Sequence, residues 1–342
     1  MSKLATNRPT MNDVAAAAGV ALKTVSRVVN DEPGVNPATA DKVKAAIDAL
    51  GFRRNDGART LRRGHTASIG VVVRDLADPF YSTLTRAVEE VALTHGFLVF
   101  TGSSDESPSR QRELALAFCA RRVDGVVIVP VGEDHLYLQP EIAAGVAAVF
   151  VDRPAANLDA DAVLVDNVGG VRKGIEHLLA HGHRRIGFLG DAPDIFTAGE
   201  RVRGYREALT SAGHIIDPSL ISMASPTRAA VRAALDRMLG GPSPATALFT
   251  GNSRVTVAVL RELAEPPPEH VKRRRPALVG FDDFEVADLL SPAVTVIAQD
   301  PARIGRAAAE LLFRRMENKN REVVRRELPT RLIVRGSGEM PP

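Results

Sequence analysis

Three histidines form the first cluster of side chains in this sequence that could bind a metal ion. His177 and His181 are spaced i,i+4, which places two ligands on one face of a helix, and His183 follows closely. The cluster leads directly into an apolar run beginning at Ile186, where a helix-to-strand turn needs polar residues in any case. We favour the turn and expect no metal site and no cofactor.

The motifs of common catalytic centres are missing from the sequence. It has no G-x-G-x-x-G or G-x-x-x-x-G-K-[ST] phosphate loop, no G-x-S-x-G elbow and no H-E-x-x-H pair. We therefore expect no catalytic residues and no enzyme. The single cysteine, Cys119, cannot form an internal disulfide, which is typical of a reducing compartment.

Charge is distributed unevenly along the 342 residues. Residues 1–65 carry a net charge of +5, whereas the remainder carries −2 and the whole chain +3. A basic leading segment on a nearly neutral body is typical of a nucleic-acid-binding protein, although a solvated basic terminus would give the same balance. The choice depends on how the basic residues are positioned.

Three short helices are predicted to position the basic residues of this leading segment. Thr10 can cap a helix from Met11 that ends at Gly19, and a second helix runs from about Leu22 to Val29. This second helix has an inward valine stripe and exposes Lys23, Ser26 and Arg27. A third helix begins at Asn36-Pro37 and ends at Gly51. Two helices joined by a tight glycine turn, with a polar, basic second helix, indicate a DNA-reading helix-turn-helix.

From Ser68 onward, short β-branched runs alternate with amphipathic helices. This pattern predicts parallel sheets of the doubly wound type, and about 275 residues are enough for two lobes. Ligands of such folds bind at the carboxyl ends of the strands. No apolar run is long enough to span a membrane, and the N-terminus does not read as a signal peptide, so we expect a cytoplasmic, nucleoid-associated protein without a membrane partner.

The leading segment contains MNDVA from Met11, AGV from Ala18 and TVSRVVN from Thr24. With these motifs it resembles the head of the lactose-repressor (LacI/GalR) family of bacterial transcription regulators. It implies that Leu22, Lys23 and Arg27 meet bases or phosphates in the major groove and that Thr24 and Ser26 bind phosphates. Helical spacing would also allow Leu22 to pack inward. The expected DNA-binding residues of the head are Thr10, Leu22, Lys23, Thr24, Ser26, Arg27 and Asn30.

Residues 55–62 resemble the hinge helix of that family, which orders on operator DNA. Leu61 matches the leucine that wedges into the minor groove, and Asn55, Ala58 and Arg59 are the other expected contacts. Three departures weaken the match. Ala21 replaces the usual capping serine, Arg54 the usual proline, and Gly57 a better helix former, so both head and hinge should be less preorganised.

The body resembles the periplasmic-binding-protein-like core of the same family. The motifs that carry the likeness are DPFY at Asp78, RRVDG at Arg121, VDR at Val151, HGHRRI at His181, RxxGY at Arg201, GFDD at Gly280 and SPxxT at Ser291. The expected fold is thus an all-α helix-turn-helix head with a hinge helix, followed by a two-lobed α/β domain. The expected boundaries are 1–52 (head), 53–65 (hinge and linker) and 66–342 (body), with an N-lobe of 66–164 plus 295–320 and a C-lobe of 165–294 plus 321–342.

The resemblance also implies an effector pocket between the lobes. Phe80 and Tyr81 match aromatic residues that stack on a ligand ring, and Arg201 and Asp282 match a pair that clamps hydroxyls or polar ring atoms. Arg201 and Asp282 could instead pair with each other, and Tyr81 could belong to the core. The other expected lining residues are Arg153, Asp166, Thr197 and Asn252. Ile195 stands where purine-binding relatives have arginine, so a sugar or polyol is favoured over a purine.

The predicted function is therefore a transcriptional regulator, most often a repressor in this family, that binds a near-palindromic operator as a homodimer under control of a small-molecule effector. The sequence leaves open the identity of the effector, whether it induces or corepresses, the operator and the target genes. A periplasmic solute-binding protein or a doubly wound enzyme without a DNA role would share the body, but neither would need the basic head.

Overall fold

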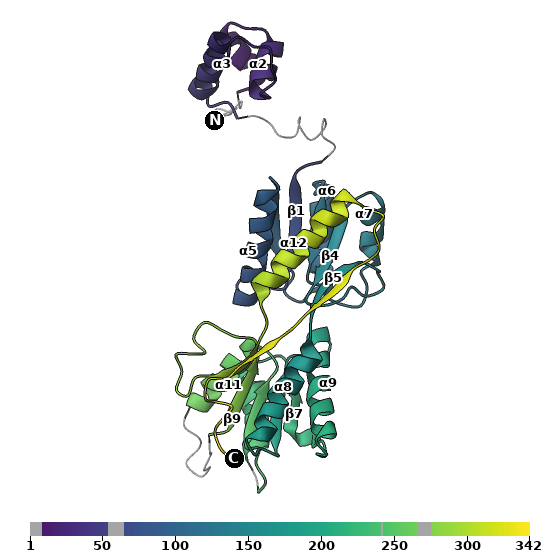
Figure 1. Ribbon diagram of the computed structural model, residues 1–342, viewed down its shortest axis with the longest axis vertical. Helices are drawn as coiled ribbons and strands as arrows, with labels where there is room; N and C mark the ends of the chain where they lie inside the picture. The colour runs from purple at the N-terminus through teal and green to yellow at the C-terminus, as the bar shows by residue number, and fades with distance from the viewer. Residues whose placement is uncertain (1–8, 54–64, 241, 266–274) are drawn as a thin grey trace, which may run out of the picture. The chain divides into compact units, whose positions relative to one another are not determined.

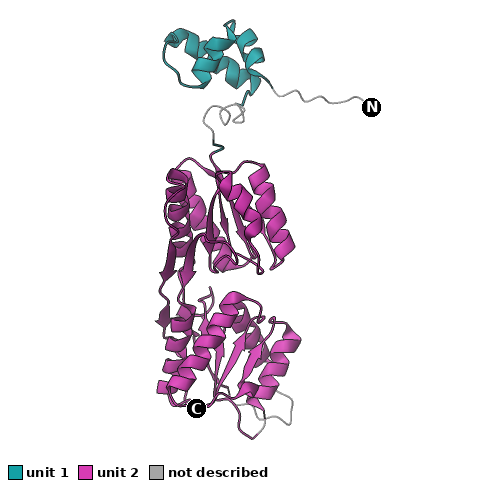
Figure 2. Ribbon diagram, turned by 90° about the vertical axis from the view of Figure 1, so that its right-hand side faces the viewer, with its two compact units in different colours: residues 1–66 teal, residues 67–342 magenta. Residues whose placement is uncertain are grey.

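The computed structural model describes residues 9–53, 65–240, 242–265 and 275–342. The chain divides into two compact units, Met1–Thr66 and Ala67–Pro342, coloured separately in Figure 2. The predicted hinge residues Asn55, Ala58, Arg59 and Leu61 lie outside the described residues. In the part of the chain that is described, no helix has both the length and the apolar character needed to cross a membrane.

The described residues of the first unit form three helices, two of which have the side-chain caps that the sequence predicts. The three helices are α1 (Met11–Ala18), α2 (Leu22–Val29) and α3 (Pro37–Leu50). Thr10 and Asp13 form a capping box on α1, and Asn36 caps α3 by accepting from the Ala38 amide at 2.9 Å. Val14, Val25 and Val43 meet in a small core, one from each helix. Ala21 provides no side-chain cap for α2, as its side chain predicts.

The described residues of the second unit form two sheets of six strands, one in each lobe (Figure 1). The N-lobe sheet is parallel throughout. Its strands, in sheet order, are β11 (Arg325–Leu328), β5 (Asp161–Val165), β4 (Ala147–Val151), β3 (Gly125–Ile128), β1 (Ser68–Val73) and β2 (Leu98–Ser103). The helices of this lobe are α5 (Pro79–Thr94), α6 (Pro108–Ala120), α7 (Gln139–Ala143) and α12 (Pro301–Glu317).

The C-lobe sheet repeats this arrangement, except that the strand contributed by the C-terminal segment runs antiparallel to its neighbour. Its strands, in sheet order, are β12 (Arg331–Ile333), β10 (Thr295–Ala298), β9 (Ala277–Phe281), β8 (Ala247–Thr250), β6 (Ile186–Gly190) and β7 (Ile221–Met223). The helices are α8 (Asn167–Ala180), α9 (Phe196–Ser211), α10 (Arg228–Leu239) and α11 (Ser253–Ala264). The predicted doubly wound, two-lobed fold is thus confirmed.

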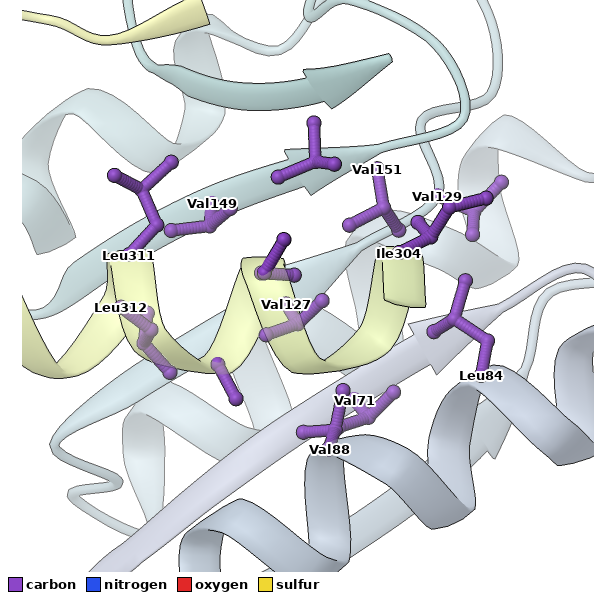
Figure 3. Packing of buried hydrophobic residues seen from close by; sticks show 14 of the residues in the cluster. Val71, Leu84, Val88, Val127, Val129, Val149, Val151, Ile304, Leu311 and Leu312 are labelled. Atoms are coloured by element: carbon purple, nitrogen blue, oxygen red, sulfur yellow. The ribbon is translucent and has the colours of Figure 1, made fainter. Parts of the chain in front are cut away.

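Each sheet is buried on both faces, which explains why its strands read as continuous apolar runs. In the N-lobe, α5 and α12 cover one face, where alternate valines of β1, β3, β4 and β5 are buried. Figure 3 shows side chains of α12 and α5 meeting these valines. The other face packs against α6 and the region of α7. In the C-lobe, α8 and α9 lie on one face and α10 and α11 on the other.

Two of the three predicted crossings between the lobes are displaced. The first follows β5, within two residues of the expected Leu164. The second was expected at Thr295, but Thr295–Ala298 pairs with β9 inside the C-lobe sheet, so the crossing follows Ala298. The third was expected at Arg321, but Arg325–Leu328 pairs with β5 in the N-lobe sheet, so it follows Leu328. The N-lobe therefore takes its second segment from after Ala298 to Leu328.

Candidate functional site

A cavity lies where the carboxyl ends of strands from both lobes converge, as expected for these sheets. Its lining residues follow β1, β4, β6, β8, β9 and β10 or begin α5, α9 and α11. They are Arg74, Asp78, Phe80, Tyr81, Asp152, Arg153, Asp191, Ile195, Thr197, Ala198, Arg201, Gly251, Asn252, Ser253, Arg254, Asp282 and Gln299. The cavity measures about 40 Å³. An adjoining cavity of about 600 Å³ shares Arg74, Arg153, Asp191, Ile195 and Arg254 with it.

All but one of the predicted effector residues line this cavity. Those that the structure brings together are Phe80, Tyr81, Arg153, Thr197, Arg201, Asn252 and Asp282. Asp166 is the exception, because it is absent from the lining and its carboxylate caps α8 by accepting from the Gly169 amide at 2.7 Å. In this structure the Asp166 side chain caps a helix, and its contact with an effector stays a prediction.

Arg201 is the central cation of the C-lobe side. Its Nε donates to Asn167 Oδ1 at 2.8 Å, and its Nη1 donates to the Gly251 carbonyl at 2.7 Å. Nη1 also lies 3.8 Å from Asp282 Oδ2, and the guanidinium stacks over the Phe281 ring at 3.9 Å. These contacts fix the ends of α8, β8 and β9 around one buried side chain. Arg201 and Asp282 do pair, but within the C-lobe and not across the cleft, and their role in clamping a ligand stays a prediction.

A chain of ion pairs joins the two lobes beside the cavity. Arg74 follows β1 in the N-lobe, and its Nη1 lies 3.5 Å from Asp191 Oδ2, which follows β6 in the C-lobe. Asn252 donates to the same carboxylate oxygen at 3.1 Å. On its other side, Arg74 Nε lies 3.2 Å from Glu106, which accepts two hydrogen bonds from Arg153 at 2.6 and 2.9 Å.

Glu106→Gln is expected to destabilise the fold near neutral pH and to have less effect as the pH falls below about 4.5. Burial alone raises the pKa of Glu106, but the hydrogen bonds and charge of Arg153, with the charge of Arg74, outweigh it and lower the pKa. A carboxyl whose pKa is lowered by folding stabilises the protein above its unfolded pKa, and this stabilisation is lost as the pH falls through the folded pKa.

Urea denaturation of the parent protein and of Glu106→Gln, at neutral pH and at two acidic pH values, measures the difference in their free energies of unfolding. Glu90→Gln, which removes one partner of the exposed Arg86–Glu90 pair, is the control and should change little at any pH. A destabilisation by Glu106→Gln that stayed constant on acidification would contradict the assignment.

Two aspartates at the cavity occupy equivalent places in the two lobes. Asp152 follows β4 with φ +70°, and Asp282 follows β9 with φ +69°, so both adopt the left-handed region that non-glycine residues rarely enter. Each donates its amide to the neighbouring strand, Asp152 to Val163 at 3.0 Å and Asp282 to Ile297 at 2.9 Å. Backbone strain of this kind concentrates at functional sites. Burial also raises the pKa of Asp282, partly offset by the charge of Arg201.

The two aromatic residues have different roles in the wall of the cavity. Their rings meet edge to face, with centroids 5.0 Å apart. Tyr81 is only 5% exposed and belongs to the N-lobe core, and burial raises its pKa. Phe80 is partly exposed. The alternative of a core role for Tyr81 is thus correct in part, and Phe80 offers more of its ring to a ligand.

Several lining residues of equal standing were not predicted from the sequence. Arg74, Asp191 and Gln299 each directly follow a strand, which is the one signal that could have found them. Asp78 and Asp152 stood inside quoted motifs without being chosen. Asp78 caps α5 through the Phe80 amide at 3.0 Å, and burial raises its pKa.

Two of the three histidines considered for a metal site, His177 and His183, fasten the C-terminal segment. His177 contacts the Glu339 carboxylate. His183 contacts Thr246 Oγ1 at 2.9 Å and the Met340 carbonyl at 2.8 Å, and the His181 ring contacts the His177 carbonyl at 2.8 Å. No group of three or more metal-ligating side chains occurs among the residues that the structure describes.

In the first unit, α2 presents the side chains predicted to read DNA. Leu22 is 47% exposed and is no part of the head core, so the alternative of inward packing is wrong. Lys23 is exposed, and Thr24, Ser26 and Arg27 are partly exposed. Asn30 donates to Ser26 Oγ at 3.3 Å, and the Thr10 hydroxyl bonds Asp13 in the capping box, so both of these predicted contacts also have intramolecular partners.

Comparisons with known proteins agree with both units. Residues 10–55 match the family model of bacterial regulatory proteins of the lacI family, and residues 175–338 match a periplasmic binding protein-like domain. The chain is 36% identical over 341 residues to the HTH-type transcriptional regulator CelR of Thermobifida fusca, covering 97% of this chain and 98% of that protein.

Two solved structures resemble the whole chain. A CelR–cellobiose complex has a TM-score of 0.68 at 34% identity, over 96% of this chain and 100% of that one. The Lac repressor dimer bound to operator and the anti-inducer ONPF has a TM-score of 0.82 at 26% identity, over 97% and 99%. With a helix-turn-helix head, a two-lobed body and these matches along nearly its full length, the chain belongs to the lacI family of DNA-binding transcriptional regulators.

Proposed function

We propose that this regulator binds a near-palindromic operator as a homodimer and that a sugar or polyol in the cavity between its lobes controls this binding. The charge balance of the cavity carries the proposal. Its lining has four arginines and four aspartates: Arg74, Arg153, Arg201, Arg254, Asp78, Asp152, Asp191 and Asp282. A neutral ligand with many hydroxyl groups suits such alternating donors and acceptors, together with the Phe80 ring, better than a phosphate or another multiply charged ion does.

The size of the cavity supports coupling between effector and DNA. About 40 Å³ has room for a few water molecules and none for a sugar ring, so a sugar that contacts these residues requires lining side chains or whole lobes to move, or extends into the adjoining cavity of about 600 Å³. The Arg74–Asp191 contact joins the lobes beside this cavity. A ligand that competes for Arg74 or Asp191 changes the preferred arrangement of the lobes, and a change of this kind is what an allosteric regulator transmits. Induction, as in most sugar-responsive relatives, is the favoured direction.

A thermal-shift screen tests the effector. We expect glucose, galactose, ribose, cellobiose or a polyol at about 100 times its dissociation constant to raise Tm by roughly 5–10 °C. The same ligand should change the affinity for a DNA fragment selected from a random library. A sugar phosphate and a nucleoside serve as comparisons. If no sugar or polyol shifts Tm, the effector assignment is wrong, whereas salt-sensitive DNA binding would still support the regulator.

Exposed apolar side chains support the homodimer. Leu98 and Phe100, on the edge strand β2, are 66% and 42% exposed, and Leu93 near the end of α5 is 58% exposed. Large apolar side chains exposed on a sheet edge or a neighbouring helix end are costly in water unless a partner covers them. The two heads of such a dimer would bind the two half-sites of the operator. Because the operator is bacterial DNA, we expect the regulator to act in the cytoplasm.

Leu98→Asp is expected to convert a dimer to a monomer, because a buried charge would replace apolar contact at the interface. Sedimentation equilibrium should give twice the chain mass of 36.6 kDa for the parent protein and 36.6 kDa for the variant. Ile215→Asp is the matched control, since Ile215 is 96% exposed in the C-lobe. A parent protein that sediments as a monomer would contradict the dimer.

A further inference from the structure

Gln299 occupies an unusual place, because it is both a crossing residue and a wall of the cavity. It follows β10 of the C-lobe and precedes Asp300, the N-cap of α12 in the N-lobe. Its backbone therefore belongs to the short link by which the chain passes from one lobe to the other. Its side chain lines the cavity beside Asp282.

The carboxylate of Asp282 fixes the orientation of the Gln299 amide. Gln299 Nε2 donates to Asp282 Oδ1 at 2.5 Å. Turning the amide over would place Oε1 against a carboxylate oxygen, and two acceptors repel each other. The carbonyl oxygen is thereby held away from Asp282, and its direction follows from this hydrogen bond.

The Gln299 carbonyl oxygen is buried and has no hydrogen-bond partner among the described residues. Buried acceptors are rarely left in this state, because the lost hydration costs free energy that no partner returns. Among the described residues, three other buried side-chain atoms also lack a hydrogen-bond partner: Thr85 Oγ1, Arg153 Nε and Thr330 Oγ1. Arg153 also lines the cavity, but its Nε lies 3.4 Å from an Asp152 oxygen, so Gln299 is the acceptor there that an external donor can satisfy.

We propose that Gln299 is a specificity-determining residue that accepts a hydrogen bond from a hydroxyl of the effector. Asp282 stands beside it with both oxygens already near donors, Oδ1 with Gln299 and Oδ2 with Arg201, and retains lone pairs for one more donor. The two acceptors together select a ligand with two neighbouring hydroxyl donors, such as a vicinal diol of a sugar. This inference rests on the proposed sugar effector and identifies Gln299 as a protein group that recognises one of its hydroxyls.

Because Gln299 lies at the crossing between the lobes, its contact with a ligand also involves the helices of the N-lobe. α12, which begins two residues after Gln299, packs tightly on α5, where Gly305 approaches the Leu84 carbonyl so closely that a side chain would clash. The N-terminal end of α5 carries Phe80 and Tyr81. A ligand hydroxyl held by Gln299 is therefore tied to the same rigid helix pair that supplies the aromatic wall of the cavity.

Gln299→Met tests the proposal when it is combined with modified ligands. Methionine keeps the approximate length of the side chain and removes the carbonyl, but it also removes the amide donor to Asp282, so the ligand series has to isolate the carbonyl contact. The probes are glucose, galactose, ribose and cellobiose, together with the monodeoxyfluoro derivatives of whichever binds. Fluorine keeps the size of a hydroxyl but cannot donate a hydrogen bond. In the parent protein, one derivative should bind about tenfold more weakly than the sugar itself. In Gln299→Met, the sugar should lose about the same factor, and that derivative should lose nothing further.

Thr85→Val is the matched control. It removes another buried, unpartnered side-chain oxygen in the N-lobe, but Thr85 does not line the cavity. Its sugar affinity should equal that of the parent. A sugar that binds the parent and Gln299→Met equally would overturn the assignment of Gln299 and leave the proposed effector intact. The assignment of Gln299 is also wrong if every fluoro derivative binds the parent as well as the sugar does, a comparison that needs no variant. If neither these four sugars nor any polyol binds the parent, the proposed effector and this inference are overturned together, whereas the proposed DNA binding stands.

Discussion

Arg201→Met should lower the free energy of unfolding of the two-lobed unit by about 3–5 kcal/mol and abolish the response to the effector. The variant removes the donor for Asn167 Oδ1 and for the Gly251 carbonyl, and it leaves the buried Asp282 without its cation. Removing one partner of a buried charge network costs more than the network contributes, because the remaining charge keeps its desolvation penalty. The stacking on Phe281 is lost in part as well.

Urea denaturation followed by circular dichroism measures the stability, and the thermal-shift screen measures the response. Arg203→Met is the matched control, two residues further along α9. Arg203 makes two ion pairs, to Glu200 and Glu207, but it is 52% exposed, so the control should lose less than about 1 kcal/mol and respond normally. An Arg201→Met protein that kept its stability and its ligand response would contradict the central role of this arginine.

The double variant Lys23→Ala with Arg27→Ala should weaken operator binding about 100-fold or more and leave ligand binding unchanged. Both residues lie on α2, and Lys23 is exposed close to its N-terminal end. Each side chain that reads a base edge or a phosphate in the major groove contributes of the order of 1–3 kcal/mol. Loss of two cations should also flatten the salt dependence of binding, since fewer counterions are released.

Fluorescence anisotropy with a selected DNA fragment at several salt concentrations measures both effects. Lys42→Ala with Lys44→Ala is the charge-matched control, because these exposed lysines lie on α3 and not on the recognition helix. The control should lose only a minor part of the affinity. Equal losses for the two double variants would show that net charge alone, and not α2, determines binding.

The head could be predicted almost completely from the sequence because its signals are local. Asn36-Pro37 and Gly51 define the ends of α3 through hydrogen bonds and a left-handed backbone that only adjacent residues determine. The exposure of Leu22 could not be predicted in this way. Spacing places it beside Val25 and Val29, and only the packed helices show that no neighbour covers it.

The body was predicted less completely, because several of its strands depend on distant partners. β11 has the sequence RREL and is mostly exposed at the edge of its sheet, so no apolar pattern marks it. Only the folded chain shows that β11 lies beside β5, and for this reason the third crossing was predicted too early in the sequence. Asp191 and Gln299 were missed because their place in the site also depends on distant segments of the chain. Each becomes a site residue because a strand end from far along the chain arrives next to it.

The threading of the last strands has a consequence for biosynthesis. The N-lobe lacks α12 and β11, and the C-lobe lacks β10 and β12, until residues 295–333 have been made. Neither lobe can therefore complete its sheet before these residues have left the ribosome. The head, with its local contacts, folds early, whereas the body folds late. A chain terminated before Thr295 would carry a folded DNA-binding head on a body with two open sheet edges, which is a substrate for chaperones and proteases.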